Sequence, residues 1–228
     1  MRTTMDIDVN ITGMNFEIDS LVNMITNIIG INLYDDVIFE IDKTMPIKED
    51  SEYGGYKFKL FAKLNNIKIP FSVDISTGDL ITPRAIEYTY KTILEKENIS
   101  LYTYNYETII AEKLETILRR NIANSRMKDY YDIYYFVNFK WNDIDINTLK
   151  MAITTTFKHR HSNEYLNNFN EIIFNIEKDD FIASRWKNYR NEHEYAKKIE
   201  FEDTIFAINK LYRNILHDSE KVTVDISK

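Results

Sequence analysis

The sequence has no cysteine, and its 228 residues include only five glycines and three prolines. The lack of cysteine excludes disulfide bonds, zinc–thiolate sites and thiol chemistry, and it fits a reducing cytoplasm. So few glycines and prolines argue against long flexible linkers. No secretory signal is present, and no apolar run approaches the roughly 18 residues of a membrane-spanning helix. We therefore expect a cytoplasmic protein with no membrane contact.

An excess of positive charge is also lacking, because the net charge is −7. A uniformly basic surface for nucleic acid is excluded, so any such contact must be a local patch. The P-loop, the G-x-G-x-x-G turn and the G-x-S-x-G elbow are absent, which leaves the corresponding enzyme classes without support. Hydrophobic residues make up 44% of the chain, which is enough for a packed core of one large or two small domains.

The first third of the chain has the alternation of apolar and polar residues that is typical of strands. Strands are predicted over residues 6–11, 36–43, 57–64 and 67–75. An amphipathic helix is predicted over residues 16–29. Only Asn65 and Asn66 separate the last two strands, which predicts a two-residue hairpin.

From about residue 85 the apolar period becomes helical. Helices are predicted over residues 85–97, 105–121, 127–139, 145–157, 162–176, 178–190 and 201–216. The composition changes near residues 95–104, so we expect a sheet subdomain over 1–97 and a helical domain over 98–228. The predicted fold class is α+β, with a small mixed sheet followed by a helical bundle.

Three aspartates lie on the polar faces of predicted strands. Asp6 and Asp8 share one face of the first strand, and Asp74 lies on the polar face of the strand 67–75. Carboxylate oxygens suit Mg²⁺, which leaves its other positions to water and substrate phosphate. The three groups converge only if the two strands are neighbours. The alternative is that they are solvated polar positions on a half-exposed sheet.

A lysine and two aspartates are the candidates among the predicted helices. Lys113 flanks the apolar stripe of the helix 105–121, where it can bind a triphosphate as a point charge or extend into solvent. Asp129 and Asp132 are three residues apart on one helix face, although Asp129 is also well placed to stabilise a helix start.

Residues 113–128 carry a local excess of positive charge. They hold one acid, Glu115, and five basic residues: Lys113, Arg119, Arg120, Arg126 and Lys128. A basic patch beside clustered acids suits polyphosphate or the end of a nucleic acid, and a solvated helix face is the alternative. The basic run 158–161 is open to the same two interpretations. Tyr130 and Tyr134 fall at helical core spacing and are interpreted as packing.

These motifs together resemble those of the nucleotidyltransferase-like toxins of the AbiEii/AbiGii family. The run Arg2-Thr3-Thr4-Met5-Asp6-Ile7-Asp8 resembles the family's metal-binding strand. The segment Val73-Asp74-Ile75 with Gly78-Asp79 is similar to the one that brings the third carboxylate. The segment Ala111-Glu112-Lys113-Leu114 with Arg119-Arg120 resembles its lysine motif. The segment Arg126-Met127-Lys128-Asp129-Tyr130-Tyr131-Asp132 resembles its Arg-x-Lys-Asp-x-x-Asp motif.

The resemblance implies a partial polymerase-β-like nucleotidyltransferase sheet followed by a C-terminal helical domain. It implies transfer of a nucleotide from a nucleoside triphosphate to RNA, such as a tRNA 3′ end, or to a protein acceptor. It also implies Mg²⁺ as cofactor, a cognate antitoxin, and a role in type IV toxin–antitoxin systems or phage defence. The residues that it assigns to metal binding or catalysis are Asp6, Asp8, Asp74, Lys113 and Asp129. Those that it assigns to nucleotide binding are Lys113, Arg120, Arg126 and Asp132.

One element of the family pattern is not among the residues of this sequence. In the family a Gly-Ser or Gly-Gly-Ser/Thr turn precedes the Asp-x-Asp strand, and its backbone N–H groups hold the triphosphate. Here Gly54-Gly55 follows the acids in a hairpin-like context, so it does not replace that turn. We therefore expect an N-terminally incomplete active site. Two alternatives stay open: a catalytically incomplete remnant that binds an antitoxin or RNA, and an α+β structural protein with surface acids.

Overall fold

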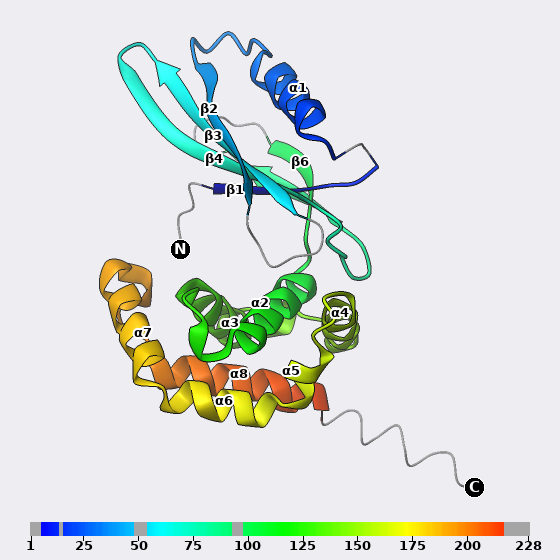
Figure 1. Ribbon diagram of the computed structural model, residues 1–228, viewed down its shortest axis with the longest axis vertical. Helices are drawn as coiled ribbons and strands as arrows, with labels where there is room; N and C mark the ends of the chain where they lie inside the picture. Colours follow the sequence, from blue (N-terminus) through cyan, green and yellow to red (C-terminus); the bar gives the residue numbers. More distant parts are fainter. Residues whose placement is uncertain (1–5, 14–15, 48–53, 93–97, 217–228) are drawn as a thin grey trace, which may run out of the picture. The chain divides into compact units, whose positions relative to one another are not determined.

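The computed structural model describes residues 6–13, 16–47, 54–92 and 98–216. The chain divides into two compact units, Met1–Asp79 and Leu80–Lys228 (Figure 1). The predicted domain boundary at 97/98 lies further along the chain than this division and stays a prediction. No helix of the described residues has both the length and the apolar character needed to cross a membrane.

The first unit is built on a four-stranded mixed sheet. Its elements are β1 (Asp6–Ile11), α1 (Ile18–Ile29), β2 (Ile38–Ile47), β3 (Gly55–Leu64) and β4 (Ile67–Thr77). The strand order is β1-β4-β3-β2, with β1 parallel to β4 and the other pairs antiparallel. The predicted turn at Asn65-Asn66 joins β3 to β4, and Asn65 has the positive φ of 52° that a tight hairpin turn requires.

The core of the first unit lies between α1 and one face of the sheet. Leu21 of α1 and Phe58 and Ile75 of the sheet are fully buried. The opposite face, which carries the even-numbered residues of β4, is polar. The alternation of apolar and polar residues along 67–75 predicts that Ile67 and Ile69 point into the core, but they are 59% and 54% exposed. That prediction was wrong because the tip of the hairpin extends beyond the cluster that α1 covers.

The second unit begins with a two-stranded antiparallel ribbon rather than a helix. Its strands are β5 (Ile86–Lys91) and β6 (Asn98–Thr103). The helix predicted over residues 85–97 is therefore wrong for the part that the structure describes. Ile86, Tyr88 and Tyr90 alternate with polar residues and so lie on one face of the ribbon, opposite Leu101 and Ile99 of the partner strand. In residues 86–91 the apolar side chains recur at every second residue, and this strand pattern, rather than the apparent helical spacing, matches the structure.

The described residues after β6, up to residue 216, are mainly helical, as predicted. Their elements are α2 (Tyr106–Arg120), η1 (Asn121–Ala123), α3 (Met127–Phe139), η2 (Trp141–Asp143), α4 (Ile146–His159), α5 (Asn163–Asn167), α6 (Phe169–Lys178), α7 (Asp180–Glu192), η3 (Glu194–Ala196) and α8 (Phe201–Leu216). The helix predicted over 162–176 is two helices, α5 and α6. The described elements confirm the α+β class, with a mixed sheet followed by helices.

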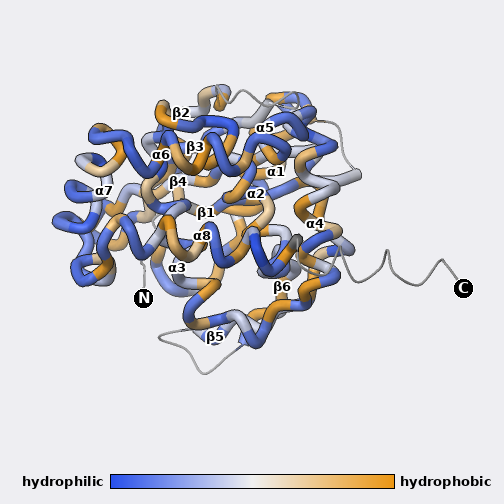
Figure 2. The backbone as a smooth tube through the Cα atoms, turned by 90° about the horizontal axis from the view of Figure 1, so that it is seen from below, coloured by the Kyte–Doolittle hydropathy of each residue, from blue (hydrophilic) through white to orange (hydrophobic). Residues whose placement is uncertain are grey.

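Apolar residues recur along the helices with the period that buries one face of each (Figure 2). Ile110, Leu114 and Leu118 of α2 are fully buried, which confirms the predicted stripe. On α3, Tyr130 is also fully buried, so its interpretation as packing is confirmed. Burial also raises the pKa of Tyr130, so its phenol stays protonated at neutral pH and is unsuited to act as a general base.

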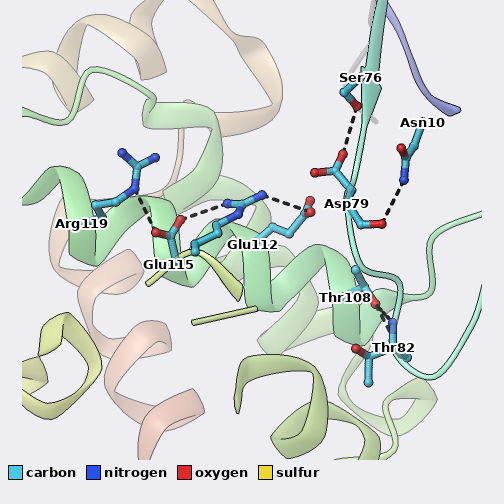
Figure 3. Close-up of polar contacts among 9 residues, drawn as sticks. Asn10, Ser76, Asp79, Thr82, Thr108, Glu112, Glu115 and Arg119 are labelled. Atoms are coloured by element: carbon cyan, nitrogen blue, oxygen red, sulfur yellow. Dashed lines mark hydrogen bonds and ion pairs between the residues drawn. The ribbon is translucent and has the colours of Figure 1, made fainter. Parts of the chain in front are cut away.

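A buried carboxylate, Glu115, links α2 to the end of α4. Its side chain is 0% exposed and accepts hydrogen bonds at 2.9 Å from Arg119 Nε, drawn in Figure 3, and from Arg160 Nη1. Arg160 Nη2 also lies 3.2 Å from Glu112 Oε1. Arg160 belongs to the basic run 158–161, and these contacts give it a structural role within the helical unit.

We expect Glu115→Gln to lower the free energy of unfolding by about 3 kcal/mol, because two arginines lose the charge that compensates theirs. Glu112→Gln is the matched control on the same helix. Its carboxylate is 26% exposed and pairs with Arg160, so a loss below about 1 kcal/mol is expected. Urea denaturation followed by circular dichroism measures both values. Equal losses for the two variants would contradict this structural role of Glu115.

Candidate active site

The aspartates of the first unit lie on neighbouring strands. Parallel pairing of β1 with β4 places Asp8 directly opposite Asp74, and Asp6 opposite Ser72. Adjacent strands are separated by roughly 4.8 Å, so side chains at paired positions on one face are immediate neighbours. The strands thus meet the condition on which convergence of these carboxylates depends. The residues 2–5 of the same motif, and the side chain of Asp6, lie outside the described part of the structure.

Hydrogen bonds at the ends of the two strands support this pairing. Asn10 Nδ2 donates to the carbonyl of Asp79 at 3.1 Å, and Ser76 Oγ donates to Asp79 Oδ2 at 3.0 Å (Figure 3). Thr77 Oγ1 donates to the carbonyl of Ile11 at 2.9 Å. A slip of one residue would break these bonds and would turn Asp8 to the other face of the sheet.

Lys57 is a member of this polar face that the sequence-based prediction missed. Its Nζ lies 3.0 Å from Asp74 Oδ2 and 3.5 Å from Ser72 Oγ. The side chains of Lys57 and Asp74 are 29% and 22% exposed. A signal for Lys57 was present, since the turn at Asn65-Asn66 pairs Leu64 with Ile67, and counting back along the hairpin places Lys57 opposite Asp74.

The donor set of this face fits a hard divalent cation. Asp8 and Asp74 offer carboxylate oxygens from neighbouring positions, which is the ligand type that Mg²⁺ takes. Among the described side chains, no group of three acidic or histidine residues is placed to hold a metal ion. Because the side chain of Asp6 is outside that description, the three-carboxylate set stays a prediction.

The second unit brings together Lys113 of α2 with Asp129 and Asp132 of α3. Lys113 Nζ lies 2.7 Å from Asp132 Oδ2 and 3.3 Å from Asp129 Oδ1. The lysine is 17% exposed and Asp132 is 13% exposed. The spacing of three residues on α3 therefore presents both carboxylates to one ammonium group. The interpretation of Lys113 as an extended surface lysine does not hold.

Asp129 is the most buried charged group of this cluster. Its side chain is 1% exposed, and its second oxygen accepts a hydrogen bond at 2.9 Å from Arg126 Nε. Arg126 is the N-cap residue of α3 and makes no capping hydrogen bond through its side chain. The position of Asp129 in the first turn is favourable for its charge. Its carboxylate nevertheless binds two cationic side chains, so capping alone does not explain it.

The basic patch predicted from residues 113–128 carries less uncompensated charge in the structure, because several of its basic side chains pair with carboxylates. Lys113, Arg119 and Arg126 each form an ion pair with a carboxylate of the helical unit. Arg120 lies seven residues from Lys113, two turns further along one helix face. Its Nε is buried and has no hydrogen-bond partner among the described residues. The proposed nucleotide-binding role of Arg120 stays a prediction, because the described contacts do not join it to this cluster.

The mixed sheet followed by helices gives the protein an α+β fold. The chain matches the family model of the nucleotidyl transferase AbiEii toxins of type IV toxin–antitoxin systems over residues 1–207, and it belongs to this family.

One solved structure supports this fold at a TM-score of 0.50. JHP933 from Helicobacter pylori superposes with a TM-score of 0.50 at 15% identity, covering 97% of this chain and 79% of that one. A proposed nucleotidyltransferase from H. pylori gives a TM-score of 0.46 at 11% identity, covering 97% of this chain and 81% of that one. No curated protein gives a significant match.

We expect Asp129→Asn to lower the melting temperature by about 6–10 °C, because two cationic side chains lose their buried counter-charge. Asp132→Asn is the control. Asp132 is more exposed, and Lys113 keeps Asp129 in that variant, so a change below about 3 °C is expected. Differential scanning fluorimetry measures both. If Asp132→Asn lowered the melting temperature more than Asp129→Asn does, burial would not determine how much Asp129 contributes to stability.

Proposed function

We propose that this protein transfers a nucleotide from a nucleoside triphosphate to an RNA acceptor, such as the 3′ end of a tRNA. The acceptor hydroxyl attacks the α-phosphorus and releases its proton, the bond between the α-phosphorus and the α–β bridging oxygen breaks, and pyrophosphate leaves. Membership of the toxin family supports the reaction class. A protein hydroxyl is an acceptor of the same chemistry, and the assay below distinguishes the two.

The carboxylates of the first unit are proposed to serve metal binding. Asp6, Asp8 and Asp74 would hold Mg²⁺, which neutralises the negative charge of the phosphates when it is bound. The pairing of Asp8 with Asp74 supports this role. Lys57 contacts Asp74 on the same face, and we propose that it orients that carboxylate.

The position of Lys113 is the observation that carries the proposed function. Two carboxylates hold its ammonium group, and 17% of the side chain stays exposed. A cation fixed before substrate binds loses little free energy to reorganisation when phosphate charge develops. Asp129, at 1% exposure, is too buried to touch a substrate, so we propose that it positions Lys113 and Arg126. Asp132 and Arg126 are proposed to complete the nucleotide contacts, together with Arg120.

The biological setting follows from the family and is part of the proposal. We infer that the reaction takes place in the cytoplasm, where triphosphates and RNA acceptors are available. A cognate antitoxin would counteract it, and phage defence is the proposed role of the pair. These statements rest on the match to type IV toxin–antitoxin proteins.

We expect Lys113→Ala to slow nucleotide transfer by about 100-fold, because a preorganised cation at the phosphates is lost. Lys210→Ala, which removes an exposed lysine of α8, is the control and should keep the wild-type rate. The protein is incubated with Mg²⁺, each α-³²P-labelled triphosphate and total RNA, and products are separated on a denaturing gel. Label in protein bands alone would identify a protein acceptor. Binding of RNA or antitoxin without transfer to any acceptor would contradict the proposal and favour the incomplete-remnant alternative.

The metal proposal is tested by the Mg²⁺ concentration that gives half-maximal transfer. We expect Asp8→Asn and Asp74→Asn each to raise this concentration by about tenfold or more. Loss of a residue that only hydrogen-bonds to a metal ligand already weakens metal binding by about tenfold, and loss of a ligand itself weakens it at least as much. Asp42→Asn, on β2 of the same sheet, is the control. An unchanged Mg²⁺ dependence in both variants would remove these residues from the metal site.

A further inference from the structure

A continuous chain of aromatic rings runs over α3, α7 and η3. We call it the aromatic ladder, and its members in order of contact are Phe139, Tyr135, Tyr131, Tyr195, His193 and Tyr189. Ring centroids of successive members lie 5.5, 6.3, 4.8, 5.2 and 4.4 Å apart. The rings of His193 and Tyr195 are stacked at 17°.

The two exposed members of the ladder, Phe139 and Tyr135, differ from its member Tyr131, which is 8% exposed and belongs to the helical core. Phe139 is 64% exposed and Tyr135 is 38% exposed, whereas Tyr130 on the same helix is fully buried. The rings of the ladder are also held in place, since the hydroxyls of Tyr189 and Tyr195 are 2.9 Å apart. Aromatic groups that are ordered and partly exposed can stack on a ligand at little cost in conformational entropy.

Basic residues are interleaved with the aromatic residues of the ladder. The segment 185–198 carries five basic and two acidic residues, and two of the basic residues are paired, Arg190 with Glu200 and Lys197 with Glu194. Lys187 and Lys198 in this segment are exposed. Polar aromatic rings combined with cations match the chemistry of single-stranded nucleic acid, in which bases stack on rings and phosphates meet basic side chains.

We propose that the aromatic ladder binds unpaired bases of single-stranded RNA, an inference that rests on the proposed RNA acceptor. Tyr135 lies one turn beyond Asp132 on α3, and Asp132 contacts Lys113. The exposed part of the ladder therefore begins next to the lysine to which phosphate binding is assigned. Lys187 and Lys198 contact the phosphates of the bound strand. The ladder is sequence-tolerant, because every base presents an aromatic face.

Fluorescence anisotropy of the full chain with a labelled 12-nucleotide poly(U) RNA, without triphosphate or Mg²⁺, tests the ladder. We expect Tyr135→Ala to weaken binding by about 5- to 150-fold, the range for loss of one stacked base. Tyr135→Phe keeps the ring and should stay within about twofold of the wild type. Phe181→Ala removes a ring of α7 that is 76% exposed and lies outside the ladder, so it should also leave binding unchanged.

Two further readouts separate base stacking from binding by charge alone. A labelled 12-base-pair RNA duplex should bind more weakly than poly(U), because its bases are not available for stacking. Lys198→Ala should reduce the slope of log K against log salt by about 0.7, which corresponds to one phosphate contact. Circular dichroism of each variant confirms that the helices are retained.

Binding by the Tyr135→Ala variant and binding of the RNA duplex decide whether the ladder stacks on unpaired bases. Unchanged poly(U) binding by Tyr135→Ala, or equal affinity for duplex and single strand, would overturn it. Loss of antitoxin binding with intact RNA binding in Tyr135→Ala would identify the surface as a protein interface and would overturn it as well. Poly(U) binding that depends on Tyr135, with no nucleotide transfer by the wild type, would support the ladder while contradicting the proposed function.

Discussion

The helical unit depends on the pairing of carboxylates that α2 and α3 bury. Glu107, Glu115 and Asp129 are 7%, 0% and 1% exposed. An unpaired charge in such a position costs several kcal/mol, so only an arrangement that supplies partners is stable. Glu107 accepts a hydrogen bond at 2.8 Å from the backbone N–H of Asp145, the residue before α4. The other two carboxylates bind cationic side chains.

These pairs explain why stability and proposed chemistry share the same residues. Asp145 precedes α4 and Arg160 follows it, so α2 holds α4 at both of its ends. Lys113 joins α2 to α3 through Asp129 in the same way. The ammonium group for which we propose phosphate binding is thus part of the helix packing itself. Because Lys113 is held between two helices rather than on a flexible loop, its ammonium group keeps one position. A cation that is already in position loses little free energy to reorganisation when it meets a negative charge.

The sheet follows a different constraint, which is strand register. Parallel pairing of β1 with β4 sets Asp8 opposite Asp74, and antiparallel pairing with β3 adds Lys57 to the same row. A row with two carboxylates and one ammonium group balances its own charge in part. Asp79 supports the register through its contacts with Asn10 and Ser76.

Residue patterns predicted the elements whose periodicity is strong and local. The bounds of α3, the hairpin at Asn65-Asn66 and the spacing of Asp129 and Asp132 were all readable from residue patterns, as was the family resemblance. The ribbon of β5 and β6 was missed because its alternation was short. Which distant side chains meet became clear only from the tertiary structure, which brings Arg160 to Glu115 and the ring of Tyr195 to that of Tyr131. Such contacts join residues far apart in the chain, and local periodicity carries no information about which distant side chain completes a buried pair.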